Sequence, residues 1–272
     1  MKQNHYLTAK KQKLNLKVTF LGTGTSQGVP MITCQCRVCQ STDQRDKRYR
    51  SSVLVEVKGK TFVIDTGPDF RNQMLDNQVM RLDAILITHS HKDHVAGLDD
   101  VRAYNYHMNK AMELYATEDS QQQLKREFEY VFNGFHYPGI PQINLHTIHT
   151  DPFGIEGIPV IPVQVMHYKL PVLGFRIGNF AYITDANHIE PGEMQKIKGV
   201  DVLVLNALRH EKHISHFTLE EAIAVAQESG ARQTYFTHIS HQLGLHAEVD
   251  AQLPAGINLA HDRLSIEIAD TF

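Results

Sequence analysis

The stretch from Thr88 to His94 constrains this chain most, because it places His89, His91, Asp93 and His94 within six positions. The residues just before it, Asp83 to Thr88, are apolar and β-branched enough to predict a buried strand. The stretch from Gly97 to His107 can form a helix. We therefore expect the cluster at the carboxyl end of a strand, where open α/β sheets bind their ligands. Imidazole and carboxylate are ligands that Zn²⁺ and similar divalent ions prefer, so the pattern predicts a metal site.

The spacing within the cluster indicates more than one ion. In an extended or turning segment, His89 and His91 can face the same side and reach one ion. Asp93 and His94 enter the next turn and can serve a second ion close by. A polar surface loop is the alternative, but such a loop rarely collects three histidines and an aspartate. The run resembles the His-X-His-X-Asp-His signature of the metallo-β-lactamase superfamily.

This resemblance implies an α+β fold, a four-layer αββα sandwich, with further ligands at the ends of later strands. His167 follows the apolar run 158–166, Asp185 closes the run 180–184, and His238 ends the run 233–237. By resemblance, His89, His91 and His167 would hold one ion. Asp93, His94 and His238 would hold the other, with Asp185 between them. His167 or His238 alone would more often be an ordinary histidine, and the order of all the matches is what favours ligation.

A second cluster contains all three cysteines of the chain, Cys34, Cys36 and Cys39. Their number is odd, which disfavours a disulfide framework. The spacing is tight enough to surround one tetrahedral Zn²⁺, which still needs a fourth ligand. A redox Cys-X-X-Cys and unreactive buried cysteines are the alternatives. His241 is the candidate fourth ligand, because it lies three residues after His238 and cannot easily serve the same ion.

The resemblance then narrows to one branch of the superfamily. The segment Gly22–Pro30, the cysteine cluster, Asp65–Pro68 and Thr237–Gln242 resemble the PhnP-type branch over about Val18 to Ile268. This branch contains the cyclic phosphodiesterases of carbon–phosphorus lyase pathways. The resemblance implies a structural zinc on Cys34, Cys36, Cys39 and His241.

The same resemblance implies a metal-dependent hydrolase that cleaves a small phosphodiester, cyclic ones included. Two divalent ions (Zn²⁺ or Mn²⁺, with Fe²⁺ also compatible) would activate a water as the nucleophile. Asp93 would orient this water or accept its proton. His216, just before the helix start at Thr218, matches the histidine-bearing loop of the branch and would donate to the leaving group. A surface histidine at a helix start is the alternative for His216, and His210 and His213 are weaker candidates.

Composition limits the partners that we expect. A net charge of −3 gives no general attraction to nucleic acid or to an anionic membrane. No run approaches the roughly 18 apolar residues that span a bilayer. Residues 1–15 are polar and Lys-rich, which predicts a flexible lead-in and no signal peptide. We therefore expect one domain over residues 16–272 and a cytoplasmic location, and a homodimer would fit the family.

Three rival functions share parts of these patterns. A tRNase Z-like RNA-processing endonuclease needs a basic Gly/Pro-rich arm, and residues 131–142 contain Gly and Pro with little positive charge. Thioester and lactam hydrolases of this superfamily lack the cysteine cluster. The cofactor-biosynthesis protein PqqB carries such a cluster with a degraded catalytic set, whereas His89, His91, Asp93 and His94 are intact here. The remaining histidines without a matching motif are predicted to be surface or core residues: His107, His136, His146, His149, His188 and His246.

Hydrophobic periodicity predicts the elements of two strand-rich halves with helices outside. Strands are expected at 16–21, 52–57, 61–64, 83–88, 143–149, 158–166, 172–177, 180–184, 200–206, 233–238 and 264–268. Helices are expected from 68 to about 77, at 97–107, at 117–130, from 191, and at 219–229.

Overall fold

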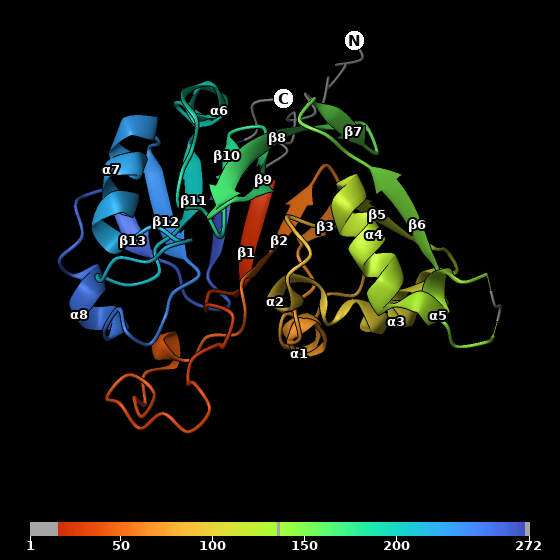
Figure 1. Ribbon diagram of the computed structural model, residues 1–272, viewed down its shortest axis with the longest axis horizontal. Coiled ribbons are helices and arrows are strands. Elements are labelled where there is room, and N and C mark those ends of the chain that lie inside the picture. Colours follow the sequence, from red (N-terminus) through yellow and green to blue (C-terminus); the bar gives the residue numbers. More distant parts are fainter. Residues whose placement is uncertain (1–15, 135–136, 270–272) are drawn as a thin grey trace, which may run out of the picture.

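Two seven-stranded β-sheets form the centre of the molecule (Figure 1). The computed structural model describes residues 16–134 and 137–269, so the expected lead-in (1–15) and His136 lie outside the described residues. The first sheet has the spatial order β14 (Ser265–Ile268), β1 (Leu16–Gly22), β2 (Ser52–Val57), β3 (Lys60–Ile64), β4 (Ala84–Leu86), β5 (Met112–Ala116) and β6 (Ile143–Thr147). The pairs from β3 to β6 are parallel, and the others are antiparallel.

The second sheet also has a parallel and an antiparallel part. Its order is β13 (Ile257–Leu259), β12 (Gln233–Thr237), β11 (Val202–Asn206), β10 (Phe180–Tyr182), β9 (Leu170–Ile177), β8 (Ile158–His167) and β7 (Phe153–Ile155). The strands from β10 to β13 are parallel, and β7 to β10 pair antiparallel. In both sheets the parallel strands direct their carboxyl ends toward a common edge.

Helices cover the outer face of each sheet, which completes the four layers (Figure 1). The first sheet carries α1 (Phe70–Asp76), α2 (Lys92–Val95), α3 (Arg102–Met108), α4 (Glu118–Glu127) and α5 (Glu129–Phe132). The second carries α6 (Pro191–Ile197), α7 (Leu219–Ser229) and α8 (His246–Asp250). Two 3₁₀ turns, η1 (Gln44–Asp46) and η2 (Leu98–Val101), lie in the connections. The expected αββα sandwich is confirmed.

Aromatic side chains fill the space between the sheets. Phe20 and Phe62 from the first sheet pack in one buried cluster with Phe175, Phe180 and Tyr182 from the second. Separate apolar clusters lie between each sheet and its own helices. Strands such as β4, β10 and β11 are therefore buried on both faces, which explains why their sequences are continuously apolar and do not alternate.

Several boundaries differ from those expected. The helix predicted at 97–107 begins as η2 before α3, and the helix predicted at 117–130 breaks at Phe128 into α4 and α5. Several short elements were not predicted, namely η1, α2, β5, β7, α8 and β13. The sequence of β5, Met-Glu-Leu-Tyr-Ala, is rich in helix formers, and its pairing between β4 and β6 overrides that preference. None of the described helices combines the length and hydropathy needed to cross a membrane.

Candidate metal centre

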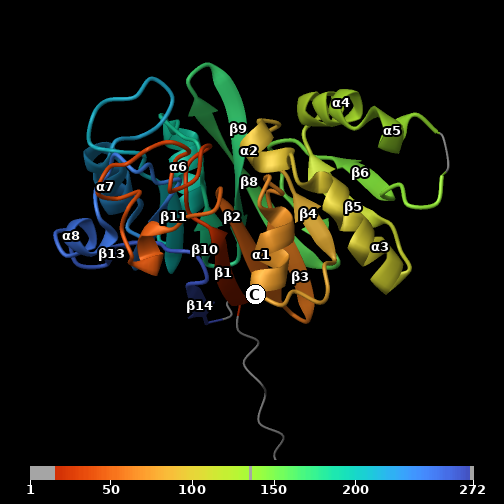
Figure 2. The same cartoon turned by 90° about the horizontal axis from the view of Figure 1, so that it is seen from below.

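The carboxyl ends of strands from both sheets meet at one end of the sandwich, the upper edge in Figure 2, where α2 lies. His89 and His91 follow β4, and Asp93 and His94 lie on α2. His167 ends β8, Asp185 follows β10, and His238 follows β12. The backbone N–H of Leu173 in β9 donates to the carbonyl of Thr88 at 3.1 Å, which joins the two sheets at this point. The structure thus brings together all seven residues that were predicted as dinuclear ligands.

His89, His91 and His167 form the first group, and one ligand atom from each lies within 4.8 Å of the others. Nε2 of His89 is 3.0 Å from Nδ1 of His91, so both nitrogens are directed toward one small region. Burial lowers the pKa of His89 well below its ordinary value, and burial also lowers the pKa of His167. Both imidazoles therefore favour the neutral form, which is the form that binds a metal.

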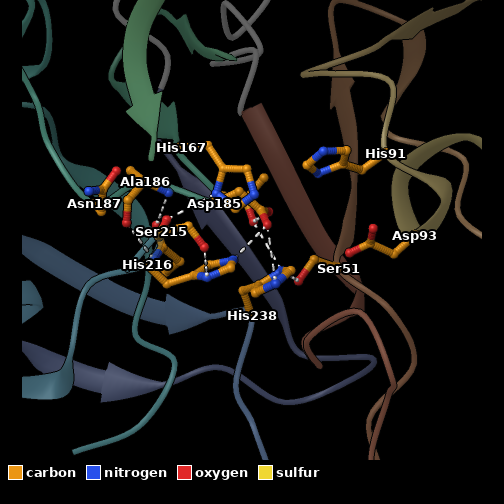
Figure 3. A network of polar contacts seen from close by, with 12 residues as sticks. Ser51, His91, Asp93, His167, Asp185, Ala186, Asn187, Ser215, His216 and His238 are labelled. Carbon is orange, nitrogen blue, oxygen red and sulfur yellow. Dashed lines mark hydrogen bonds and ion pairs between the residues drawn. The ribbon is translucent and has the colours of Figure 1, made fainter. Parts of the chain in front are cut away.

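Asp93, His94, Asp185 and His238 form the second group, again with ligand atoms within 4.8 Å. Nε2 of His94 lies 3.2 Å from carboxylate oxygens of both Asp93 and Asp185. Nε2 of His238 lies 3.2 Å from the other oxygen of Asp185, so this carboxylate contacts the imidazole of His238 as well as that of His94 (Figure 3). Burial would lower the pKa of His94, yet the charges of Asp185, Asp65 and Asp93 raise it well above the ordinary value. This position therefore favours a positive charge, whether a proton or a metal cation.

The chemistry of these donors fits divalent cations. Nε2 of His94 is fully buried and makes no hydrogen bond to any described residue, although two carboxylates approach it. Buried polar atoms normally have a partner, and a divalent cation bound here would supply one. Five imidazoles and two carboxylates are a suitable ligand set for Zn²⁺, Mn²⁺ or Fe²⁺.

A surrounding layer of hydrogen bonds orients these imidazoles. Nδ1 of His94 lies 2.7 Å from Oδ2 of Asp65, and Nδ1 of His167 donates to the carbonyl oxygen of Ser215 at 3.0 Å. Hydroxyl groups of Ser51 and Thr184 lie 3.3 and 3.4 Å from Nδ1 of His238. Partners of this kind fix the direction and the tautomer of a metal-binding histidine.

Unusual backbone conformations place three of these side chains. Asp65, Asp185 and His238 have φ values of 66°, 57° and 55°, in the left-handed region that side chains rarely adopt. Each follows a strand, and each side chain contacts another residue of the centre. Asn206 supports the turn after Asp185, because its side chain accepts from the N–H and donates to the carbonyl of Ala186, at 2.7 and 2.9 Å. Such strain persists where the surroundings hold it, often at functional sites.

His216 lies within the same centre. It is buried, and its Nε2 is 2.9 Å from Oδ1 of Asp185 (Figure 3). The ligand atoms of His216, Asp185 and His167 also lie within 4.8 Å of one another. Nδ1 of His216 is 3.0 Å from the hydroxyl of Ser215 and 3.1 Å from Nδ1 of His213. A capping box of Thr218 with Glu221 starts α7 two residues later and fixes the end of this loop.

The three cysteines lie around His241, as expected for a second site. The Sγ atoms of Cys34 and Cys36 are 3.5 and 3.4 Å from Nδ1 of His241, and Cys39 completes the group. The backbone N–H of Cys39 donates to Sγ of Cys36 and lowers the pKa of that thiol to about 6. Burial raises the pKa of Cys39 to about 11. A cation bound here would reverse that, since a coordinating thiol is deprotonated.

Asp65 is the main site residue to which the sequence assigned no role. It lies after β3, is fully buried, and accepts from both the N–H and the hydroxyl of Thr88 at 2.8 Å. An aspartate closing an apolar strand was the available signal, and its contact with His94 depends on the pairing of β3 with β4. Of the other histidines, His246 is buried and contacts Arg48. His146 pairs with Glu113, and His188 pairs with Glu190, both outside the centre.

The fold and this centre define a member of the metallo-β-lactamase superfamily. The family model described as "Beta-lactamase superfamily domain" matches residues 60–239, and the chain belongs to this family. A solved structure of a diphosphatase from the PhnP family superposes with a TM-score of 0.88 at 43% identity, covering 93% of this chain and 97% of that one. The narrower resemblance to the PhnP-type branch is thereby confirmed.

Two further relatives carry different names. An octanoyltransferase from Porphyromonas gingivalis is 40% identical over 92% of this chain, but the chain spans only 51% of that protein. Zn²⁺-bound PqqB from Methylobacterium extorquens superposes with a TM-score of 0.74 at 20% identity, over 93% of this chain and 100% of that one. At that identity the likeness shows the fold alone.

Proposed function

We propose that this hydrolase-family chain cleaves small phosphodiesters, with two divalent ions at the candidate centre and one structural zinc on Cys34, Cys36, Cys39 and His241. The observation that carries the proposal is the convergence of His89, His91, Asp93, His94, His167, Asp185 and His238, with His216 at its border. Similarity to a PhnP-family diphosphatase supports phosphoryl chemistry.

The roles of the side chains follow from their positions. Paired divalent ions would lower the pKa of a water toward roughly 7 and neutralise charge on the phosphoryl oxygens. Burial would raise the pKa of Asp93, yet the charge of His94 lowers it, so the carboxylate is ionised. In that form Asp93 could hold an ion and orient the attacking water. His216 can donate a proton from Nε2 to the leaving oxygen, because Asp185 holds that nitrogen at the edge of the centre.

Hydrolysis of a diphosphate bond is the second candidate, favoured by the name of the 43% identical relative. Both reactions place a phosphoryl group between an attacking and a leaving oxygen, so the same residues would serve. The tRNase Z-like and PqqB-like functions are less favoured for the reasons of charge and intact ligands given above. A cytoplasmic location and a homodimer stay predictions.

Turnover and metal content test the proposal together. Freshly purified protein should contain about three ions per chain, one of them zinc that resists mild chelation. The metal-loaded protein is incubated with bis(p-nitrophenyl) phosphate, a nucleoside 2′,3′-cyclic phosphate, a dinucleoside diphosphate, a phosphomonoester, precursor tRNA and an octanoyl thioester. We expect turnover of the phosphodiesters. Turnover of the thioester alone, or of precursor tRNA alone, would overturn the proposal.

A further inference from the structure

Exposed apolar side chains gather beside the metal centre. Of the nine large hydrophobic residues that are exposed among the described residues, three border it: Tyr168 (49% exposed), Leu170 (42%) and Ile214 (64%). Tyr168 directly follows the ligand His167, and Ile214 lies two residues before His216. Single exposed apolar residues are ordinary, but a group at the border of a charged centre needs an explanation.

Strand register places Leu170 next to a ligand. In the β8–β9 hairpin, Leu170 pairs directly with His167. Residues opposite each other in an antiparallel pair project from the same face, with Cβ atoms about 5 Å apart. Leu170 therefore projects on the same side of the hairpin as the imidazole of His167.

One side chain joins the hairpin to the loop that carries His216. The amide oxygen of Asn187 accepts from the N–H of Tyr168 at 2.8 Å, and its Nδ2 donates to the carbonyl of Ile214 at 3.2 Å. Tyr168 has a φ of 57°, an unusual conformation for a bulky residue, and this hydrogen bond supports it. Asn187, two residues after Asp185, thus joins the backbone of the hairpin at Tyr168 to the backbone of the loop at Ile214.

We propose that Tyr168, Leu170 and Ile214 bind the organic group of the substrate and select phosphoryl compounds that carry an apolar or aromatic group. The inference rests on the proposed phosphodiester hydrolysis, and it names the substrate class. Ligand sites combine a few polar groups with apolar walls. Here the charged centre would hold the phosphoryl group, and the three apolar side chains would cover the group attached to it.

Binding of two non-hydrolysable phosphonates tests this selection without depending on turnover. Calorimetry of the metal-loaded protein compares phenylphosphonate with methylphosphonate. The wild type should bind phenylphosphonate about tenfold more tightly, as expected for apolar area removed from water. The double variant Leu170→Ala/Ile214→Ala should lose most of this preference. Met80→Ala is the matched control, because Met80 is 68% exposed and precedes β4, at the opposite end of that strand from the ligands.

Turnover separates this inference from the proposed function. Bis(p-nitrophenyl) phosphate and methyl p-nitrophenyl phosphate share a leaving group and differ in the second organic group. The wild type should have the higher kcat/KM for the bis-aryl diester. The double variant should reduce this advantage, mainly by raising KM for the bis-aryl diester. A wild type without preference for phenylphosphonate, or a double variant that keeps it with normal metal content, overturns the inference. Absence of turnover of both diesters, with the phenyl preference intact in the wild type and lost in the double variant, overturns the phosphodiesterase proposal and leaves the binding of an apolar group supported.

Discussion

At the scale of single residues, His216 is the group whose role in turnover can be separated from metal binding. Replacement by alanine should lower kcat about 10²- to 10⁴-fold, the usual contribution of general acid–base catalysis. Metal content should stay unchanged, as measured by elemental analysis. His188→Ala is the control, since His188 is exposed and pairs with Glu190.

Two results for His216→Ala would contradict the proposed role of His216. Unchanged kcat in a fully metal-loaded His216→Ala protein contradicts the proposed proton donation. Loss of an ion in this variant would instead make His216 a ligand, which its position near His167 and Asp185 allows.

Asp65 acts on the centre through His94 and should tune metal affinity. Its carboxylate is 2.7 Å from Nδ1 of His94 and is fully buried. Asp65→Asn should weaken metal binding about 10- to 100-fold, the usual effect of losing a partner of a ligating histidine. Competition with a chromophoric chelator measures this affinity. Asp43→Asn, which alters a surface pair with Arg45, should leave it unchanged, and equal affinities in both variants would exclude the role.

Sequence patterns identified the candidate ligands but not the residues that orient them. Histidines and aspartates at strand ends are infrequent enough to be noticed, and a family pattern gives their order. Ser51, Thr184 and Asn206 are common residue types, and their roles follow from contacts between elements far apart in the sequence. Residue type also did not identify the left-handed conformation of Asp65, Asp185 and His238. Aspartate and histidine adopt it more often than most side chains, but only in a small fraction of cases.

At the scale of elements, the cysteine cluster joins an early loop to the segment after β12. Val29, Val38 and Cys39 form a small buried cluster with the partly buried Met31 and Leu245. Such a small core orders a long loop weakly, so a zinc on the four ligands would supply much of the stabilisation. Short elements are also hard to predict from sequence. β7, α8 and β13 form because of the elements they pack against, and they are too short to show a local periodicity.

Cys36→Ser tests this cluster. We expect the loss of about one zinc per chain and a lower Tm, because a hydroxyl is a poor substitute for a thiolate ligand. Elemental analysis and calorimetry measure the two effects. Gln35→Ala changes an exposed neighbour and should alter neither. Full zinc content in the serine variant would rule out the thiolate site.

At the scale of the whole molecule, a buried polar network connects the first loop with the last residues. The guanidinium of Arg48 donates to the hydroxyl of Thr23 at 2.8 Å and to the carbonyl of Ala260 at 2.6 Å. It also donates to Nδ1 of His246 at 3.1 Å, which requires a neutral imidazole. Burial and the charge of Arg48 lower the pKa of His246 to about 4.

This pKa shift predicts a loss of stability in mild acid. An unfolded histidine binds a proton near pH 6.5, whereas folded His246 does so only near pH 4. The unfolded state therefore binds more protons between these values, and the free energy of unfolding falls as the pH falls. Urea unfolding at pH 7.5 and pH 5 should show a smaller fall for His246→Asn than for the wild type. His188→Asn should follow the wild type, and parallel behaviour of all three proteins would refute the assignment.

The ligands of the candidate centre come from both sheets: the ends of β4 and α2 on one side, and those of β8, β10 and β12 on the other. Ions bound there would stabilise only the folded arrangement, by about 4 kcal/mol for each ion supplied at a thousand times its dissociation constant. Chelation should accordingly lower Tm as well as abolish activity. In a cell with too little of these ions, more copies of the enzyme would be unfolded and degraded. The supply of metal ions would then affect the amount of the protein as well as its activity.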